Sequence, residues 1–174
     1  MSGAIVWFTG LPSSGKSHLA QRVQAALRSE GVACCQLDSD RVRSLLHPTP
    51  GYSPAERDDF YLTLGSLALE LAQQDLVVLV PATAHRRLYR AQIRARAERF
   101  LEVWLKTPLD ECRQRDAKGL YGHFARGDLQ AIPGEDLPYE APLAPEVTAA
   151  GGEDDAALHQ ILERLRSPNP PHGA

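Results

Sequence analysis

The chain has 174 residues, a length that suits one domain with a sizeable core. With 43% hydrophobic and 24% charged residues, its composition is that of a globular protein and excludes a disordered or fibrous one. The 19 basic and 22 acidic residues give a net charge of −3, which argues against a non-specific nucleic-acid binder. No apolar run reaches the roughly 18 residues that crossing a bilayer requires.

The chain opens with a strand, a loop and a helix. Residues 4–9 form an apolar run typical of a strand buried on both faces, and a glycine ends it. After a loop of small residues, apolar side chains at helical spacing predict a helix over 16–28. Residues 32–37 predict a second strand, and the polar, basic stretch 38–43 leads into a loop rich in proline.

The remaining elements also alternate between helix and strand. A helix is predicted from Ser53 to about residue 74, with serine as N-cap, proline at the first position and an acid in the first turn. Further elements are predicted as strands over 76–80 and 100–105 and as helices over 86–99, from 107 and over 154–165. Residues 168–174 are expected to form a frayed tail.

This alternation predicts an α/β fold with a parallel sheet and helices on both faces. No repeat or linker divides the chain, so we expect a single domain over 1–174. Residues 117–150 are rich in glycine, proline and charge and are too long for an ordinary connection. We therefore predict that they form a lid and substrate loop.

The strongest motif is Gly10-Leu11-Pro12-Ser13-Ser14-Gly15-Lys16-Ser17, which fits G-x-x-x-x-G-K-[ST] between a strand and a helix. Glycines let backbone N–H groups turn inward around phosphate oxygens, and the following helix adds its positive dipole end. Lys16 is the predicted catalytic cation, and Ser17 the predicted ligand of Mg²⁺. The residues expected to bind ATP are Gly10, Ser13, Ser14, Gly15, Lys16 and Ser17.

Other features narrow the reaction class. A GTPase usually carries an N/T-K-x-D motif, and none is present. An ATP-driven machine usually places an acid at the end of its buried strand, whereas the strand at 76–80 runs into Pro81 and Ala82. These absences favour a small phosphotransferase.

An acid pair, Asp38-Ser39-Asp40, follows the second strand at the carboxyl edge of the sheet, where open α/β folds bind ligands. We predict that Asp40 holds Mg²⁺ or orients the acceptor hydroxyl. The alternative is that Asp38 or Ser39 caps the next helix. Of the six arginines in 86–99, only one or two are expected to face a ligand.

Several strings occur in an order that resembles the adenylylsulfate kinase (APS kinase) family over about residues 4–150. Besides the phosphate loop they are residues 37–43, Gly51-Tyr52-Ser53, Arg57, Thr107-Pro108-Leu109, residues 112–116, Lys118-Gly119-Leu120-Tyr121 and Pro138-Tyr139-Glu140-Ala141-Pro142. The resemblance implies a three-layer P-loop kinase fold, commonly dimeric. It also implies ATP- and Mg²⁺-dependent phosphorylation of the 3′-hydroxyl of adenylylsulfate, which gives the sulfate donor PAPS.

The resemblance assigns roles by position. Asp40 would orient or deprotonate the acceptor hydroxyl, and Arg115 would lie near the ATP adenine. The residues that the family implies as contacts of adenylylsulfate are Arg43 and Arg57, together with the lid residues Lys118, Leu120 and Tyr121.

The acceptor side departs from the family pattern. Where the family has an asparagine and paired arginines this chain has Phe60-Tyr61-Leu62-Thr63, and where it has Phe-Ile-Ser-Pro this chain has Ala82-Thr83-Ala84-His85. Ser39 replaces a glycine. We expect Phe60 and Thr83 to contact the acceptor instead. Two alternatives therefore remain open: a kinase for another small hydroxyl compound, and a non-catalytic nucleotide-binding module.

The cysteines and the N-terminus bear on localisation. Cys34, Cys35 and Cys112 cannot all pair within the chain and show no metal-ligand spacing, which favours a reducing compartment. The N-terminus runs directly into the first predicted strand with no secretory signal. We therefore expect a cytoplasmic protein, with ATP and a small substrate as partners, no nucleic acid or membrane, and a homodimer as a possible assembly.

Overall fold

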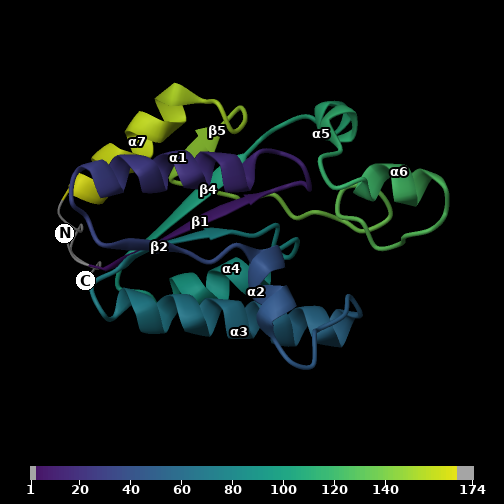
Figure 1. Ribbon diagram of the computed structural model, residues 1–174, viewed down its shortest axis with the longest axis horizontal. Coiled ribbons are helices and arrows are strands. Elements are labelled where there is room, and N and C mark those ends of the chain that lie inside the picture. The colour runs from purple at the N-terminus through teal and green to yellow at the C-terminus, as the bar shows by residue number, and fades with distance from the viewer. Residues whose placement is uncertain (1–2, 168–174) are drawn as a thin grey trace.

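The computed structural model describes residues 3–167 and is built on one parallel five-stranded sheet with the order β2-β3-β1-β4-β5 (Figure 1). The strands are β1 (Ala4–Gly10), β2 (Cys34–Gln36), β3 (Val77–Pro81), β4 (Phe100–Leu105) and β5 (Val147–Ala149). The helices are α1 (Lys16–Ser29), α2 (Ser39–Leu45), α3 (Pro54–Ala72), α4 (Arg87–Arg94), α5 (Leu109–Arg115), α6 (Leu120–Ala125) and α7 (Asp155–Arg166). The predicted tail, 168–174, lies outside the described residues.

The central strand β1 explains why two helical layers are needed. All seven of its residues are buried, and successive side chains of a strand point to opposite faces. Val6 and Phe8 enter one core with α1 and α7, whereas Ile5 and Trp7 enter the other with α3 and α4. Figure 1 shows these helix pairs on opposite sides of the sheet. The three-layer α/β fold is thus confirmed.

Three segments differ from the sequence prediction. The polar stretch 38–43 is part of helix α2, whose short length gave no periodicity. Helix α4 ends at Arg94 instead of residue 99, because the chain must reverse before Phe100 pairs with Ile5. Within 117–150 the structure forms α6 and β5, both too short to leave a pattern in the sequence.

The predicted lid lies beyond the carboxyl ends of the strands, where α5 and α6 project from the sheet (Figure 1). It has a small core of its own, centred on Cys112, Tyr121 and Ile132. This core ties α5 and α6 to the segment that returns towards β5. None of the helices within 3–167 combines the length and apolar character that a bilayer span requires.

Candidate active site

The loop between β1 and α1 has the conformation that the phosphate-loop motif predicts. Gly15 has a φ of +98°, and a Cβ placed there would lie 2.6 Å from the backbone nitrogen of Gly152. Only glycine therefore fits this position. The hydroxyl oxygens of Ser13 and Ser14 are buried and, in the part of the chain that the structure describes, have no hydrogen-bond partner. Unpartnered buried donors beside a helix N-terminus suit an anion such as a nucleotide phosphate.

Lys16 projects from the first turn of α1 back across this loop. Its Nζ donates to the carbonyl oxygens of Gly10 at 3.1 Å and Leu11 at 2.7 Å. Burial, together with the nearby positive charge of Lys118, lowers the pKa of Lys16 to about 7. Lys16 is thus a desolvated amine that is neutral in part of the molecules near neutral pH, and a phosphate would stabilise its charged form.

The acid that contacts Ser17 is Asp38, and not Asp40. Ser17 Oγ donates to Asp38 Oδ2 at 2.6 Å, while Asp38 Oδ1 accepts from the amides of Asp40 and Arg41 and caps α2. One carboxylate therefore serves both as the helix cap and as the partner of the motif serine. Its place beside Ser17 was missed because the sequence interpretation gave the metal role to Asp40 and considered Asp38, or Ser39, only as a helix cap.

Asp40 instead forms an ion pair with Lys118, across the mouth of the site. Both side chains are half-exposed, one from α2 and the other from the loop before α6. The structure thus brings the predicted catalytic carboxylate, Asp40, and the predicted lid lysine, Lys118, together. Since both line the same cavity, a substrate entering between them would have to compete with this ion pair.

Two buried arginines form the acceptor end. The Arg43 guanidinium lies 3.8 Å from the ring centroid of Phe60 and 4.5 Å from that of Tyr52, and its Nη1 donates to the carbonyl of Gly51 at 2.6 Å. Arg57 donates through Nε to the Tyr52 carbonyl and through Nη2 to the Ala131 carbonyl. Each guanidinium is fixed by backbone oxygens yet lines the cavity, so the pair can bind anionic oxygens without further ordering.

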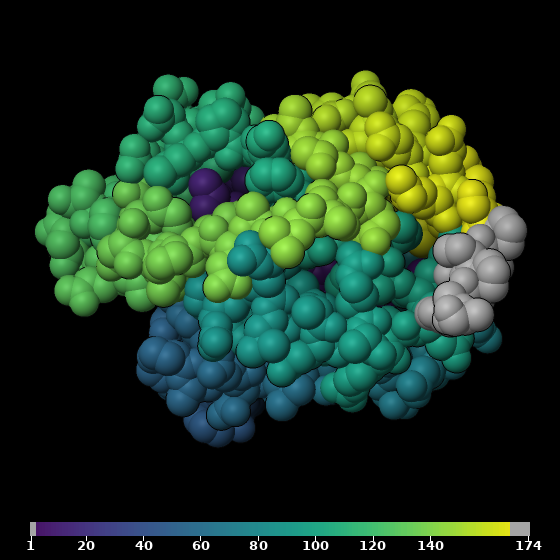
Figure 2. All heavy atoms as spheres, turned by 180° about the vertical axis from the view of Figure 1, so that it is seen from behind, coloured from purple at the N-terminus to yellow at the C-terminus, as the bar shows by residue number. Residues whose placement is uncertain are grey.

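A cavity of about 1130 Å³ connects these parts. Figure 2 shows purple atoms of the N-terminal segment at the bottom of a hollow bordered by the green segment that follows β4. The predicted site residues that line the cavity are Ser13, Gly15, Lys16, Ser17, Asp40, Arg43, Arg57, Phe60, Thr83, Arg115, Lys118 and Leu120. This volume lies slightly above the usual range of ligand pockets and leaves room for a nucleotide and a second substrate.

Three predicted site residues do not line it. Gly10 and Ser14 lie beneath the loop, and Tyr121 is buried in the lid core with its hydroxyl donating to the Pro12 carbonyl at 3.0 Å. Tyr121 therefore fastens the lid to the phosphate loop. At the opposite end, Arg115 shares the cavity wall with Gly151 and Gly152, which sequence reasoning missed although paired glycines after a strand are a turn signal.

The oxygen donors at this site fit Mg²⁺. Ser17 and Asp38 offer a hydroxyl and a carboxylate side by side, which is the hard donor set that this ion prefers. Within residues 3–167 no group of three or more His, Cys, Asp or Glu side chains could hold a metal. A nucleotide-bound Mg²⁺ needs no such cage, since it takes one or two protein ligands and completes its shell with phosphates and water.

Comparison with known proteins agrees with this geometry. The family described as Adenylylsulphate kinase matches residues 2–150. The chain belongs to the adenylylsulphate kinase family. Its fold and family are those of an ATP-dependent kinase.

Two curated relatives and one solved structure show how far the likeness extends. This family member is 42% identical to an adenylyl-sulfate kinase of Chloroflexus aurantiacus over 94% of this chain and 87% of the relative. It is 40% identical to the bifunctional enzyme NodQ of Azospirillum brasilense, of whose length it spans 27%. The Mycobacterium tuberculosis APS kinase CysC, solved with AMPPNP and APS, matches with a TM-score of 0.88 and 35% identity, covering 95% of this chain and 99% of that one.

Proposed function

We propose that this protein transfers the γ-phosphoryl group of ATP to the 3′-hydroxyl of adenylylsulfate and so forms PAPS. The observation that carries the proposal is that one cavity is lined by an intact phosphate loop, by two buried arginines and by Asp40. The relatives support it, since one was solved with a nucleotide analogue and APS together.

On the donor side, the chain supplies charge and position. Backbone N–H groups of the loop and the hydroxyl of Ser13 would bind the phosphate oxygens, and Lys16 would neutralise charge on the transferred group. Ser17, with Asp38 behind it, would hold Mg²⁺, which when bound neutralises charge between the β- and γ-phosphates. Arg115 would lie along the base of the nucleotide.

On the acceptor side, Asp40 would accept the proton of the 3′-hydroxyl. The hydroxyl oxygen would then form the bond to the γ-phosphorus while the bond from that phosphorus to ADP breaks. Entry of the substrate would separate Asp40 from Lys118 and free Lys118 to contact the substrate. Arg43 and Arg57 would bind its anionic oxygens, and Leu120 would cover it from the lid.

One observation favours a second candidate, a kinase of the same mechanism with a different hydroxyl acceptor. Arg43 already occupies a face of the Phe60 ring, and Ala82 and Ala84 are buried small residues. Thr83 lines the cavity in place of a bulky side chain. The acceptor end thus offers less surface for stacking a purine than an aromatic wall would.

Steady-state kinetics with adenylylsulfate against a panel of nucleosides, sugars and aminoglycosides decides between the two. A kcat/KM for adenylylsulfate within about 10⁴–10⁸ M⁻¹s⁻¹ is expected, with all other acceptors far below it. Higher efficiency with another acceptor would establish the second candidate. Asp40→Asn and Lys16→Ala serve as controls, and unchanged turnover in both would overturn the proposed roles of these side chains.

We propose a homodimer, on the family resemblance alone, and light scattering of the purified chain would test it. A cytoplasmic location is supported by the free thiols of Cys34, Cys35 and Cys112, since a reducing compartment keeps thiols unpaired. Fractionation of the native cell would test the location.

A further inference from the structure

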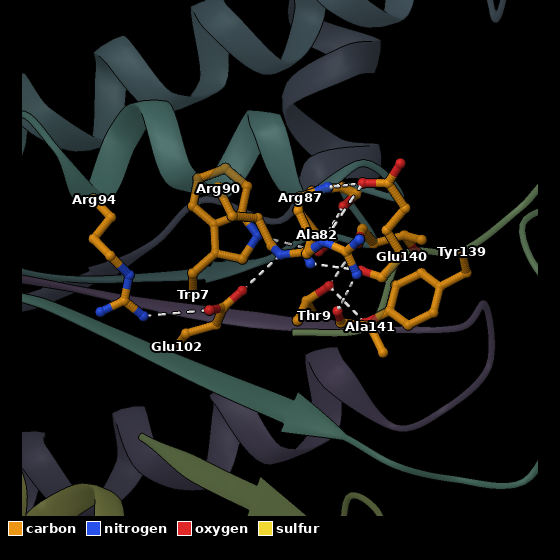
Figure 3. Close-up of polar contacts among 12 residues, drawn as sticks. Trp7, Thr9, Ala82, Arg87, Arg90, Arg94, Glu102, Tyr139, Glu140 and Ala141 are labelled. Carbon is orange, nitrogen blue, oxygen red and sulfur yellow. Dashed lines mark hydrogen bonds and ion pairs between the residues drawn. The ribbon is translucent and has the colours of Figure 1, made fainter. Parts of the chain in front are cut away.

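The segment Ala82–His85, here called the acceptor wall, follows β3 and contributes Thr83 to the cavity. It has an unusually complete set of backbone contacts. All four of its carbonyls accept a hydrogen bond from elsewhere in the chain: from Trp7 Nε1 to Ala82, Thr9 Oγ1 to Thr83, Arg90 Nη1 to Ala84 and the Glu140 amide to His85. Figure 3 shows three of these donors, Trp7, Thr9 and Arg90, converging on one region.

Arg90 is a long side chain that reaches both this wall and a second segment. It is 2% exposed, and its Nε donates to Glu102 Oε1 on β4 at 2.6 Å. Its Nη1 donates to the Ala84 carbonyl, and its Nη2 donates to the Glu140 carbonyl at 2.6 Å. All three guanidinium nitrogens are therefore used, one on the sheet and two on loops that border the site (Figure 3).

The second segment is residues 138–142, here called the return strap, which leads from the lid towards β5. Its Tyr139 hydroxyl lies 3.0 Å from Thr9 Oγ1, next to the phosphate loop. The Glu140 carboxylate accepts from the Arg87 amide at 2.8 Å, and Arg87 Nη1 donates to the Ala141 carbonyl at 3.1 Å. Arg87 thus fastens the strap to α4, and the Glu140 amide, which donates to the His85 carbonyl at 2.8 Å, fastens it to the wall.

Backbone strain at the wall makes such fixation necessary. Ala84 has a φ of +41°, a conformation that a residue with a Cβ adopts only when its surroundings enforce it. Its amide donates to the Tyr61 hydroxyl at 3.1 Å, and its carbonyl accepts from Arg90. Both polar groups of this strained peptide are therefore held by buried side chains.

We propose that Arg90 is a positioning residue for the acceptor: its guanidinium holds the acceptor wall and the return strap in the register that places Thr83 at the cavity. Only the kinetic test of this inference rests on the proposed function. The planar guanidinium of Arg90 suits this task, because its three nitrogens can bind one carboxylate and two separate carbonyls at once. A lysine at this position could keep the charge pair with Glu102 but not both carbonyls.

Arg94 is a matched control on the same helix, one turn later. It donates to the same carboxylate, through Glu102 Oε2 at 3.3 Å, and to Glu146, but it contacts neither the wall nor the strap. Loss of either arginine removes a partner of Glu102, so an effect that arises from that carboxylate should appear in both variants. Of the two arginines, Arg90 is the one that also holds the wall and the strap.

The first experiment compares Arg90→Lys, Arg90→Gln and Arg94→Gln in steady-state kinetics. In both Arg90 variants we expect the KM for adenylylsulfate to rise about tenfold or more, while the KM for ATP changes less than about twofold. Arg94→Gln should leave both constants near wild type. Equal changes in both KM values, or full rescue by lysine, would overturn the proposal. Arg90→Lys keeps the ion pair and so remains informative if Arg90→Gln does not fold.

The second experiment does not depend on the acceptor. Hydrogen exchange followed by mass spectrometry should show faster exchange at residues 82–85 and 139–141 in Arg90→Lys than in Arg94→Gln, with β1 unchanged. If the wild type fails to phosphorylate adenylylsulfate but the two segments loosen, the proposed function fails and the positioning role stands. If the wild type is active and the segments exchange alike in both variants, the positioning role fails.

Discussion

The lowered pKa of Lys16 predicts that nucleotide binding takes up a proton. A lysine with a pKa of about 7 is protonated in only about one molecule in ten at pH 8. Bound phosphates favour the charged ammonium and should return its pKa towards the ordinary range, so about 0.9 proton should enter per nucleotide. At pH 6 the lysine is already charged, and the uptake from it should fall to about 0.1.

The same linkage fixes the sign of the pH dependence. Because the neutral lysine must be protonated before it can pair with phosphate, affinity should fall as pH rises through the pKa of the free enzyme. The deprotonation of Lys16 alone should raise the Kd for the nucleotide about tenfold between pH 6 and pH 8. The phosphate oxygens themselves titrate at about pH 6, so ADP is nearly fully ionised at pH 8 and contributes little there.

Isothermal titration of ADP at pH 8 in buffers of different ionisation enthalpy measures the uptake directly. A slope of apparent enthalpy against buffer enthalpy near one proton is expected for the wild type, and a slope near zero for Lys16→Ala. Lys118→Met should raise the pKa of Lys16, because it removes a nearby positive charge, and so reduce the uptake at pH 8. A wild-type slope near zero would refute the reasoning.

Three further variants test local geometry. Asp38→Asn should keep the cap of α2 but lower kcat/KM for ATP at least about tenfold and raise the Mg²⁺ requirement, and an unchanged Mg²⁺ titration would contradict the assignment. Gly15→Ala places a Cβ 2.6 Å from a backbone nitrogen at a φ of +98°, so ADP binding should be lost in a calorimetric titration, and near-normal affinity would exclude this steric argument. Tyr121→Phe removes the hydrogen bond to Pro12 and should cost about 1 kcal/mol in urea unfolding, with faster exchange in α6; no change in either would show that the lid needs no such link.

The phosphate loop and the buried strands could be predicted because their signals are local. A strand of β1's kind is a continuous apolar run, and the motif that follows it fits within eight residues. Asp38 shows the limit of such signals, since its helix cap involves neighbours whereas its other oxygen meets a serine 21 positions earlier. No pattern in the sequence predicts the contact between Asp38 and Ser17.

The arginines show the same limit. Six of them lie between 86 and 99 at spacings that look alike in the sequence, yet Arg90 is 2% exposed and joins three segments. Its partners are a carboxylate on β4 and two backbone carbonyls, and carbonyls are present at every residue. The packing of α4 against the sheet, and not the type of residue, decides to which carbonyls Arg90 donates.

The α/β class, the parallel sheet, the phosphate loop and the family resemblance can be derived from the amino-acid sequence, because apolar runs and a compact backbone motif are encoded in short stretches of chain. Tertiary packing sets the contact between Asp38 and Ser17, the ion pair of Asp40 with Lys118, and the hydrogen bond from Arg90 to the Ala84 carbonyl. Such polar contacts contribute about 1 kcal/mol each and join distant residues, so they leave no period in the sequence. They form where the folded elements bring their partners together.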